Sequence, residues 1–174
     1  MEEKSGTDGS IQKSSAEVSW SDLPYIMMIV FCFLIRDGKI LLITRANEPY
    51  KGTRTIPGGK KWREESLREA CIREMQEETG LTVKNLKFAG LLHVIANGDE
   101  REYISAYFTS DDCEGELASS SEGDLQWVDF TDSDAIGCIH PSYAALYPLI
   151  KDSRTPFNVV LRIDPQGNST YKYE

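Results

Sequence analysis

The sequence predicts an α/β protein, and three observations lead to that fold class. Apolar runs rich in β-branched and aromatic residues, typical of buried strands, occur in both halves of the chain. A turn-rich loop containing Pro57, Gly58 and Gly59 precedes a glutamate-rich segment with helical apolar periodicity, and Gly80 is placed to end that helix. A second, short amphipathic helix is expected over residues 141–151.

The expected strands are joined by turns with clear sequence signals. Asp37-Gly38 predicts a tight hairpin between the first two strands, and Asn97-Gly98 predicts another turn. The acidic, serine-rich segment 111–124 is expected to be a loop. Strands are predicted at 25–35, 40–44, 86–96, 102–109, 125–129, 157–164 and 169–173.

Length and composition suit one compact domain over residues 20–174, because 40% of the 174 residues are apolar. Residues 1–19 are rich in Ser, Glu, Lys and Gly and hold very few apolar side chains. Such a segment buries too little surface to offset the entropy lost on ordering, so we expect a mobile tail, with Trp20 as the first docked residue.

The chain is acidic, with a net charge of −9 and an isoelectric point near 4.8. This argues against nucleic acid as a partner, since binding of phosphate backbones requires a basic surface. A small polyanion can still bind where metal ions supply positive charge. Four cysteines without metal-ligand spacing or a paired framework predict reduced thiols in a cytoplasmic protein. The apolar run 25–35 is too short to cross a bilayer, so no membrane partner is expected; the oligomeric state stays open.

The predicted central helix places carboxylates on the continuation of its own apolar stripe. At about 100° per residue, Glu74, Glu77 and Glu78 follow the azimuth of the apolar side chains of the first two turns. Those apolar side chains are Leu67, Ala70 and Cys71. The opposite face, expected to be solvated, holds Arg68, Glu69, Arg73 and Gln76.

Carboxylates on a core-facing stripe predict a cation site. Clustered carboxylates repel one another and lose hydration in a cleft, which raises their pKa unless a cation compensates. Oxygen ligands at i, i+3 and i+4 suit Mg²⁺, with Mn²⁺ as a substitute. The alternative, a merely soluble helix with many charges, does not explain why a charged face shares the azimuth of the core.

At this point the residues resemble a known family, because their spacing fits the Nudix box at each defined position. The matching pattern is Gly59-x5-Glu65-x7-Arg73-Glu74-Met75-x-Glu77-Glu78-x-Gly80-Leu81. The resemblance implies a Nudix fold, an α/β/α sandwich around a mixed β-sheet. It also implies an enzyme, a hydrolase acting on the phosphoanhydride bond of a nucleoside diphosphate linked to a further moiety.

The C-terminal half is similar to the MutT-type branch, through the segment Glu122-x4-Trp127. In that branch the glutamate approaches the metal ions from a loop; the alternative is one acid among several in a polar segment. In the human member of that branch a tryptophan and two aspartates read the purine; this chain has Cys138, His140 and Pro141 at those positions, where many bacterial members vary as well. The approach to the helix also differs from the common Pro-Gly-Glu, since Trp62-Arg-Glu-Glu65 stands there.

The resemblance assigns roles to individual residues. Glu74 and Glu78 are expected as principal metal ligands, Glu77 as a further ligand, and Glu122 as a ligand or the base. Which glutamate is the general base stays open. Arg73 is expected to orient the glutamates or the loop, and Glu65 to support the loop or pair with an arginine.

Substrate contacts are expected from the loop and from strand aromatics. Gly58 and Gly59 would bring backbone N–H groups near the phosphates. Arg45 and Lys60 are candidates for phosphate contacts, with a surface ion pair and a solvent-facing lysine as the alternatives. The candidates for the base pocket are Tyr25, Phe31, Tyr103 and Trp127, for which core packing is the alternative.

The predicted function is therefore a Mg²⁺-dependent nucleoside triphosphate pyrophosphohydrolase of MutT type, with oxidised purine nucleotides such as 8-oxo-dGTP as the leading substrates. Alternative substrates within the same fold are ADP-ribose, a dinucleoside polyphosphate or capped RNA, and the acidic surface weighs against long RNA. A Nudix-fold binding module without catalysis is a different class; the complete set of box glutamates weighs against it.

Overall fold

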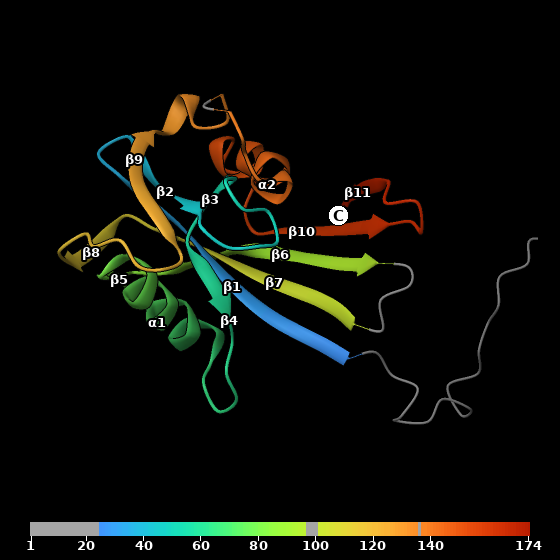
Figure 1. Cartoon of the computed structure of the whole chain (residues 1–174), viewed down its shortest axis with the longest axis horizontal. Helices are drawn as coiled ribbons and strands as arrows, with labels where there is room; N and C mark the ends of the chain where they lie inside the picture. Colours follow the sequence, from blue (N-terminus) through green and yellow to red (C-terminus); the bar gives the residue numbers. More distant parts are fainter. Residues whose placement is uncertain (1–24, 97–100, 136) are drawn as a thin grey trace, which may run out of the picture.

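The computed structural model describes residues 25–96, 101–135 and 137–174 (Figure 1). The expected mobile tail over 1–19, the docking of Trp20 and the Asn97-Gly98 turn lie outside these residues. Within them, a nine-stranded mixed sheet runs in the order β11-β10-β6-β7-β1-β2-β3, with β4 pairing with β1 and β9 with β2. A separate two-stranded sheet joins β5 and β8.

The strands of the two sheets are β1 (Tyr25–Arg36), β2 (Lys39–Arg45), β3 (Arg54–Thr55), β4 (Gly58–Lys60), β5 (Leu81–Lys84), β6 (Lys87–Ala96), β7 (Arg101–Ser110), β8 (Asp112–Gly115), β9 (Gly123–Asp129), β10 (Phe157–Ile163) and β11 (Ser169–Tyr173). The helices are α1 (Leu67–Thr79), the short 3₁₀ helix η2 (Phe130–Asp132) and α2 (Pro141–Lys151). All seven predicted strands and both predicted helices are therefore present. None of the helices in the described part of the chain is long and apolar enough to cross a membrane.

Strand β1 is central because it pairs with β7 in parallel and with β2 and β4 antiparallel. The predicted hairpin to β2 is confirmed: Asp37 and Gly38 have φ of 52° and 72°, the left-handed pair that a tight two-residue turn requires. Along β1, alternate side chains enter different cores. Cys32 packs in the α1 core, whereas Phe33 packs in the α2 core.

Helix α1 is delimited by local signals at both ends. Ser66 and Glu69 form a capping box, in which Ser66 Oγ accepts from the Glu69 N–H and Glu69 accepts from the Ser66 N–H. At the other end Gly80 adopts φ of 73°, and its N–H donates to the Gln76 carbonyl oxygen at 3.0 Å, so the predicted C-cap is confirmed. Met75 lies in the buried face of the helix and packs against the sheet.

Helix α2 covers the opposite face of the large sheet from α1, as Figure 1 shows. Its Tyr143, Leu146 and Tyr147 are buried in a core with Phe33 and Tyr107, and this core shares no residue with the core under α1. The two helices and the sheet between them form the predicted α/β/α sandwich.

The expectation of a loop over 111–124 is wrong in part. Residues Asp112–Gly115 form β8, which pairs antiparallel with β5, and β9 already begins at Gly123. Cross-strand contacts override the acidic composition here, because Lys84 pairs with Glu114 and the Val83 side chain is buried. The short strands β3 and β4 were not predicted either, since two or three residues carry no periodic signal.

Replacing Leu146 by Ala tests the core under α2. Leu146 is fully buried, so the substitution removes apolar burial and leaves a cavity, and we expect a loss of about 2–5 kcal/mol in the free energy of unfolding. The matched control is Leu117→Ala, the same chemical change at an exposed loop position, with an expected effect within about 0.5 kcal/mol. Urea denaturation of both variants is the measurement. Equal losses would contradict the assignment of this core.

Candidate active site

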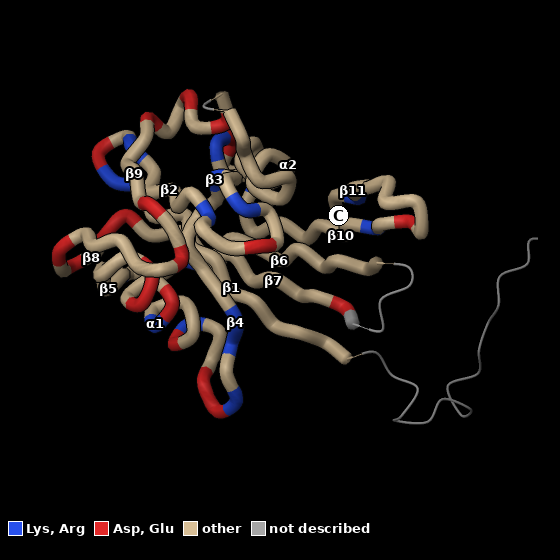
Figure 2. Tube along the Cα trace, viewed as in Figure 1, with Lys and Arg blue, Asp and Glu red and all other residues tan. Residues whose placement is uncertain are grey.

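A cleft of about 770 Å³ opens beside the amino-terminal half of β1, next to β4 and α1. Its volume is in the range of small-molecule sites. Strand β4 lies between β1 and α1 in Figure 1, and acidic residues gather along α1 in Figure 2. The lining residues are Met27, Ile29, Phe31, Arg45, Asn47, Glu48, Pro49, Gly58, Gly59, Lys60, Trp62, Arg73, Glu74, Glu77, Glu78, Tyr103, Ser120, Ser121 and Glu122.

The two glycines of β4 allow the loop to pass between β1 and α1. Gly58 pairs with Phe31, and a Cβ atom on Gly58 would lie 2.7 Å from the Phe31 Cα. A Cβ atom on Gly59 would lie 2.5 Å from the Glu74 Cδ and closer still to one of its carboxylate oxygens. A side chain at Gly58 would therefore separate β4 from β1, and one at Gly59 would push the Glu74 carboxylate away from the loop.

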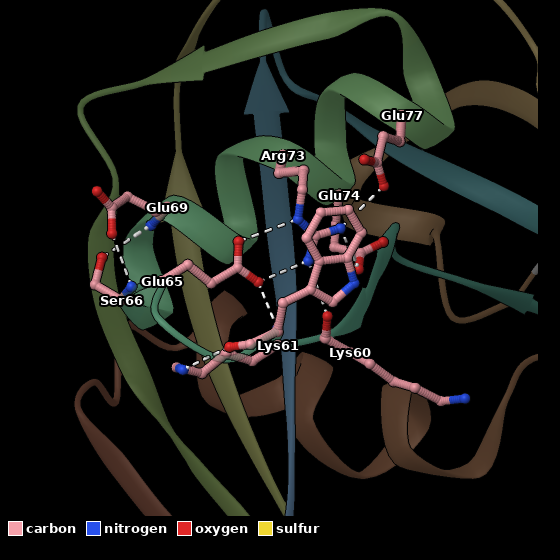
Figure 3. A network of polar contacts seen from close by, with 9 residues as sticks. Lys60, Lys61, Glu65, Ser66, Glu69, Arg73, Glu74 and Glu77 are labelled. Carbon is pink, nitrogen blue, oxygen red and sulfur yellow. Dashed lines mark hydrogen bonds and ion pairs between the residues drawn. The ribbon is translucent and has the colours of Figure 1, made fainter.

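Arg73 connects the helix to this loop (Figure 3). Its Nε and Nη2 donate to the two oxygens of Glu65 at 3.1 and 2.8 Å, and Nη2 also donates to the Lys60 carbonyl oxygen at 2.9 Å. Its Nη1 donates to Glu74 Oε1 at 2.8 Å and to Glu77 Oε2 at 2.9 Å. The arginine thus holds three carboxylates and one backbone group.

The expectation that Arg73 lies on a solvated face is wrong. Its side chain is only 17% exposed, because it folds back over the loop and its guanidinium carbon stacks 3.8 Å from the centroid of the Trp62 ring. The expected pairing of Glu65 with an arginine is present. The hydrogen bonds from Arg73 lower the pKa of Glu65 to about 2, with a further contribution from the Trp62 N–H.

Glu78 is the most enclosed carboxylate of the group. Its Oε2 accepts a hydrogen bond from the Gly58 N–H at 2.9 Å. Its pKa is raised to about 7, mainly by burial and also by the charges of Glu74 and Glu122, while the hydrogen bond from the Gly58 N–H opposes the shift. Burial also raises the pKa of Glu74, and the hydrogen bond from Arg73 opposes that shift.

Glu77 and Glu122 complete the acidic lining from two directions. Glu77 is on α1 at the rim of the apolar stripe, with half of its side chain exposed, so it follows the buried azimuth less closely than the sequence predicts. Glu122 comes from the loop before β9, where its carbonyl oxygen accepts from the Ala46 N–H at 2.8 Å. Asn47 Nδ2 lies 3.5 Å from Glu122 Oε2. The fold therefore brings Glu122 to the box glutamates, as the resemblance predicts.

The donor chemistry of this cluster fits a hard divalent cation. The side chains around the cleft offer carboxylate oxygens, and burial together with mutual repulsion raises the pKa values of Glu74 and Glu78, a cost that a cation would relieve. Within residues 25–96, 101–135 and 137–174, no three His, Cys, Asp or Glu side chains stand in a metal-binding arrangement. Arg73 neutralises part of the negative charge of Glu74 and Glu77.

Most of the predicted substrate-binding residues line the cleft: Arg45, Gly58, Gly59, Lys60, Phe31 and Tyr103. Two do not. Tyr25 is 81% exposed at the start of β1, beyond Met27. Trp127, on β9, pairs with Leu41 of β2 and packs against the α1 core. It also borders a separate hollow beside the β1–β2 hairpin. The prediction for both rests on aromatic residue type in a strand, and residue type alone does not determine which face of the sheet a side chain occupies.

Other lining residues were not predicted. Met27 and Ile29 alternate with Phe31 along β1, so the period of two would have placed them on the same face. Asn47, Glu48 and Ser121 come from loops whose path depends on tertiary structure, and no sequence pattern indicates them.

His140 caps α2 and does not line the cleft. Its Nδ1 accepts from the Ser142 N–H at 3.2 Å, and its ring meets the Tyr50 ring edge-on, with centroids 4.4 Å apart. Burial, with the nearby charge of Arg45, lowers its pKa to about 4. His140 is therefore a neutral helix cap in this chain.

Comparison with known proteins identifies the family. The model of the NUDIX domain matches residues 27–150, which include the cleft, α1 and Glu122. The chain belongs to the Nudix family. The predicted enzyme class, a Nudix hydrolase, is thereby confirmed. Nudix hydrolases generally use divalent metal ions and act on small nucleotides, in agreement with the oxygen donors of the cleft.

Three relatives show how far the sequence similarity extends. The Nudix chain is 35% identical over 114 residues to YvcI of Bacillus subtilis (strain 168), described as an uncharacterized Nudix hydrolase; the match covers 63% of this chain and 70% of that protein. It is 38% identical over 87 residues to the ADP-ribose pyrophosphatase of Methanocaldococcus jannaschii, covering 50% and 52%. It is 30% identical over 102 residues to the oxidized purine nucleoside triphosphate hydrolase of Danio rerio, covering 59% and 65%.

Solved structures share the fold. A MutT protein from Bacillus halodurans matches with a TM-score of 0.75 at 24% identity, over 85% of this chain and 97% of that chain. The NUDIX domain of Shewanella oneidensis NrtR, solved with ADP ribose, matches with a TM-score of 0.66 at 18% identity, over 80% and 96%. Together with the relatives in sequence, these matches support the predicted MutT-type membership.

Replacing His140 by Asn tests the neutral histidine cap. In the unfolded chain a histidine gains a proton near pH 6.5, whereas in the folded Nudix protein it stays neutral down to about pH 4. The unfolded state therefore binds more protons in this window, and folding stability falls as the pH drops from about 6.5 to 4.

Asn also caps helices but does not titrate. Between pH 7 and pH 5 we expect the wild type to lose about 1 kcal/mol more than His140→Asn, after allowance for solvent screening. Urea denaturation at both pH values is the measurement. An identical pH dependence in the two proteins would mean that His140 titrates normally.

Proposed function

We propose that this Nudix protein is a Mg²⁺-dependent nucleoside triphosphate pyrophosphohydrolase, which releases a nucleoside monophosphate and pyrophosphate. The observation that carries the proposal is the convergence of Glu74, Glu77, Glu78 and Glu122 on one cleft beside the Gly58-Gly59 backbone. A cleft lined by carboxylates and by backbone N–H groups suits a polyphosphate only together with cations. Mg²⁺ is the preferred ion, and Mn²⁺ is the substitute.

The bound metal would neutralise phosphate oxygens and lower the pKa of its water ligand. Glu74 and Glu78 would hold it as principal ligands, with Glu77 as a further ligand. Glu122 would serve as a ligand or accept the proton of the attacking water. Arg73 orients Glu74 and Glu77 through its two hydrogen bonds and ties them to the loop through Glu65.

Phosphate contacts would come from Arg45 and Lys60, which line the same cleft. Arg45 is held at the start of its loop, where its Nε donates to the Pro49 carbonyl oxygen at 3.0 Å. The remaining N–H groups of its guanidinium can donate to phosphate oxygens. Phe31 and Tyr103 supply apolar surface to the cleft for the nucleoside.

Oxidised purine triphosphates are the leading substrates, supported by the similarity to the Danio rerio enzyme. By the resemblance, His140 and Pro141 stand where the human member of the MutT-type branch carries two aspartates, so recognition of the base would differ in detail. ADP-ribose is the second candidate, favoured by the 38% identity to the Methanocaldococcus jannaschii enzyme. We infer a cytoplasmic location from the free thiols of all four cysteines.

A nucleotide panel tests the function directly. The purified full chain is assayed for release of pyrophosphate and orthophosphate from ordinary and 8-oxo purine triphosphates, pyrimidine triphosphates, ADP-ribose and a dinucleoside polyphosphate. Mg²⁺-dependent release of pyrophosphate, abolished by chelator, is expected for purine triphosphates. If only ADP-ribose is hydrolysed, the assignment of the active site stands, and ADP-ribose replaces the purine triphosphates as the proposed substrate. No turnover of any compound would favour a binding module.

Replacing Glu78 by Gln tests the site assignment. The substitution keeps the shape of the side chain but removes a charge at the proposed metal, so kcat should fall by about a hundredfold or more. The melting temperature should not fall, because a neutral amide relieves repulsion from Glu74 and Glu122. Glu116→Gln, the same change on an exposed loop, is the matched control and should keep full activity. Full activity in Glu78→Gln would remove Glu78 from the mechanism.

A further inference from the structure

Three neighbouring segments contribute an apolar row to the lining of the cleft. In the parallel pairing of β1 and β7, Met27 lies opposite Tyr103. On the other side of β1, Lys60 pairs with Ile29, and the Lys61 N–H continues the pairing by donating to the Met28 carbonyl oxygen at 3.0 Å. Since alternate residues share a face, Trp62 follows Lys60 onto the face of Met27 and Tyr103. Met27, Trp62 and Tyr103 all line the cleft.

The indole ring of Trp62 has one covered face and one open face. The Arg73 guanidinium carbon lies 3.8 Å from the ring centroid and covers one side. The Trp62 N–H donates to Glu65 Oε1 at 2.6 Å, so the backbone is also fixed to the Arg73–Glu65 pair. The side chain nevertheless remains 59% exposed, which leaves the second face open. An exposed tryptophan held in a fixed orientation is a ready stacking surface.

The position of this surface relative to the phosphate site indicates its ligand. Trp62 lies two residues beyond the segment Gly58–Lys60, whose backbone faces Glu74 and Glu78. A polyphosphate bound there would leave its attached aromatic group within reach of the row formed by Trp62, Met27 and Tyr103. Strand β1 carries no charged side chain before Arg36, and it is drawn without charge along that length in Figure 2. The row therefore suits a flat, weakly polar ring.

We propose that the open face of Trp62 is the stacking platform for the nucleobase of the substrate, with Met27 and Tyr103 beside it. This inference rests on the proposed function and names a subsite within it. Stacking on an aromatic ring accepts any base, and its strength grows with ring area, so purines are favoured over pyrimidines without hydrogen-bond readout. The platform would thus supply base affinity in a chain that lacks the aspartate pair.

A second role for Trp62, shielding the Arg73 ion pairs, must be separated from stacking. Loss of shielding would disturb Glu74 and Glu77 and would lower kcat on every substrate. Loss of stacking would raise KM only for ligands with an aromatic ring and would leave inorganic tripolyphosphate unaffected. Loss of shielding is therefore detected in kcat, and loss of stacking is detected in KM for ligands with an aromatic ring.

The experiment compares Trp62→Ala, Trp62→Phe and the control Trp127→Phe in the full chain with Mg²⁺. Steady-state kinetics are measured with a purine and a pyrimidine triphosphate, and tripolyphosphate serves as a competitive inhibitor without a ring. In Trp62→Ala we expect KM for the purine substrate to rise about tenfold, with kcat and the inhibition constant of tripolyphosphate unchanged. The preference for purine over pyrimidine should largely disappear. Trp62→Phe and Trp127→Phe should resemble the wild type.

A fall in kcat with unchanged KM, or an equal effect on tripolyphosphate, would overturn the platform and leave Trp62 as a positioning residue for Arg73. If the wild type hydrolyses no nucleotide, the proposed function fails separately. Quenching of tryptophan fluorescence by a purine triphosphate then decides the platform. The stacking platform is retained if quenching persists in Trp127→Phe and is lost in Trp62→Phe. It is rejected if the wild type shows no quenching.

Discussion

The ion-pair network of Arg73 is the interaction on which the site depends. A helix that places several glutamates beside its apolar face concentrates negative charge where water is partly excluded, and such a cluster is unfavourable without a counter-charge. Arg73 lies on the same helix and reaches Glu65, Glu74 and Glu77 together with the Lys60 carbonyl oxygen. One side chain thereby offsets the repulsion and fixes the loop relative to the helix. The planar guanidinium makes this possible, since an ammonium group offers no such fork.

Close backbone approach is the second requirement of the site. Gly58 and Gly59 bring β4 within contact of β1 on one side and of the Glu74 carboxylate on the other. The pairing of β9 with β2 then carries Glu122, more than 40 residues beyond Glu78 in sequence, to the same cleft. The acidic lining is therefore assembled by sheet topology as much as by the periodicity of one helix.

Local patterns predicted the parts of this structure that depend on local forces. The existence of α1 and its end followed from its periodicity and its glycine cap, and the β1–β2 hairpin followed from Asp37-Gly38. The azimuths of Glu74 and Glu78 were also predictable. What failed depended on tertiary contacts: the fold-back of Arg73 onto Trp62, the β5–β8 pairing inside an acidic segment, and the face on which Trp127 lies. A helical wheel gives the direction of a Cβ atom, but the position of the terminal group of a long side chain such as Arg73 depends on its hydrogen-bond and packing partners. Glu122 was predicted through family resemblance alone.

The large sheet keeps the two cores apart, and this separation divides the supports of the cleft. The core under α1 carries the helix of the box glutamates, whereas the core under α2 shares no residue with it. Phe31 packs against the core under α2, where its ring stacks on Tyr107 with centroids 5.2 Å apart, and it also lines the cleft. A substitution beneath α2 therefore reaches the cleft through Phe31, on the side proposed for the nucleoside. Changes in substrate preference can thus arise from a core that contains none of the box glutamates.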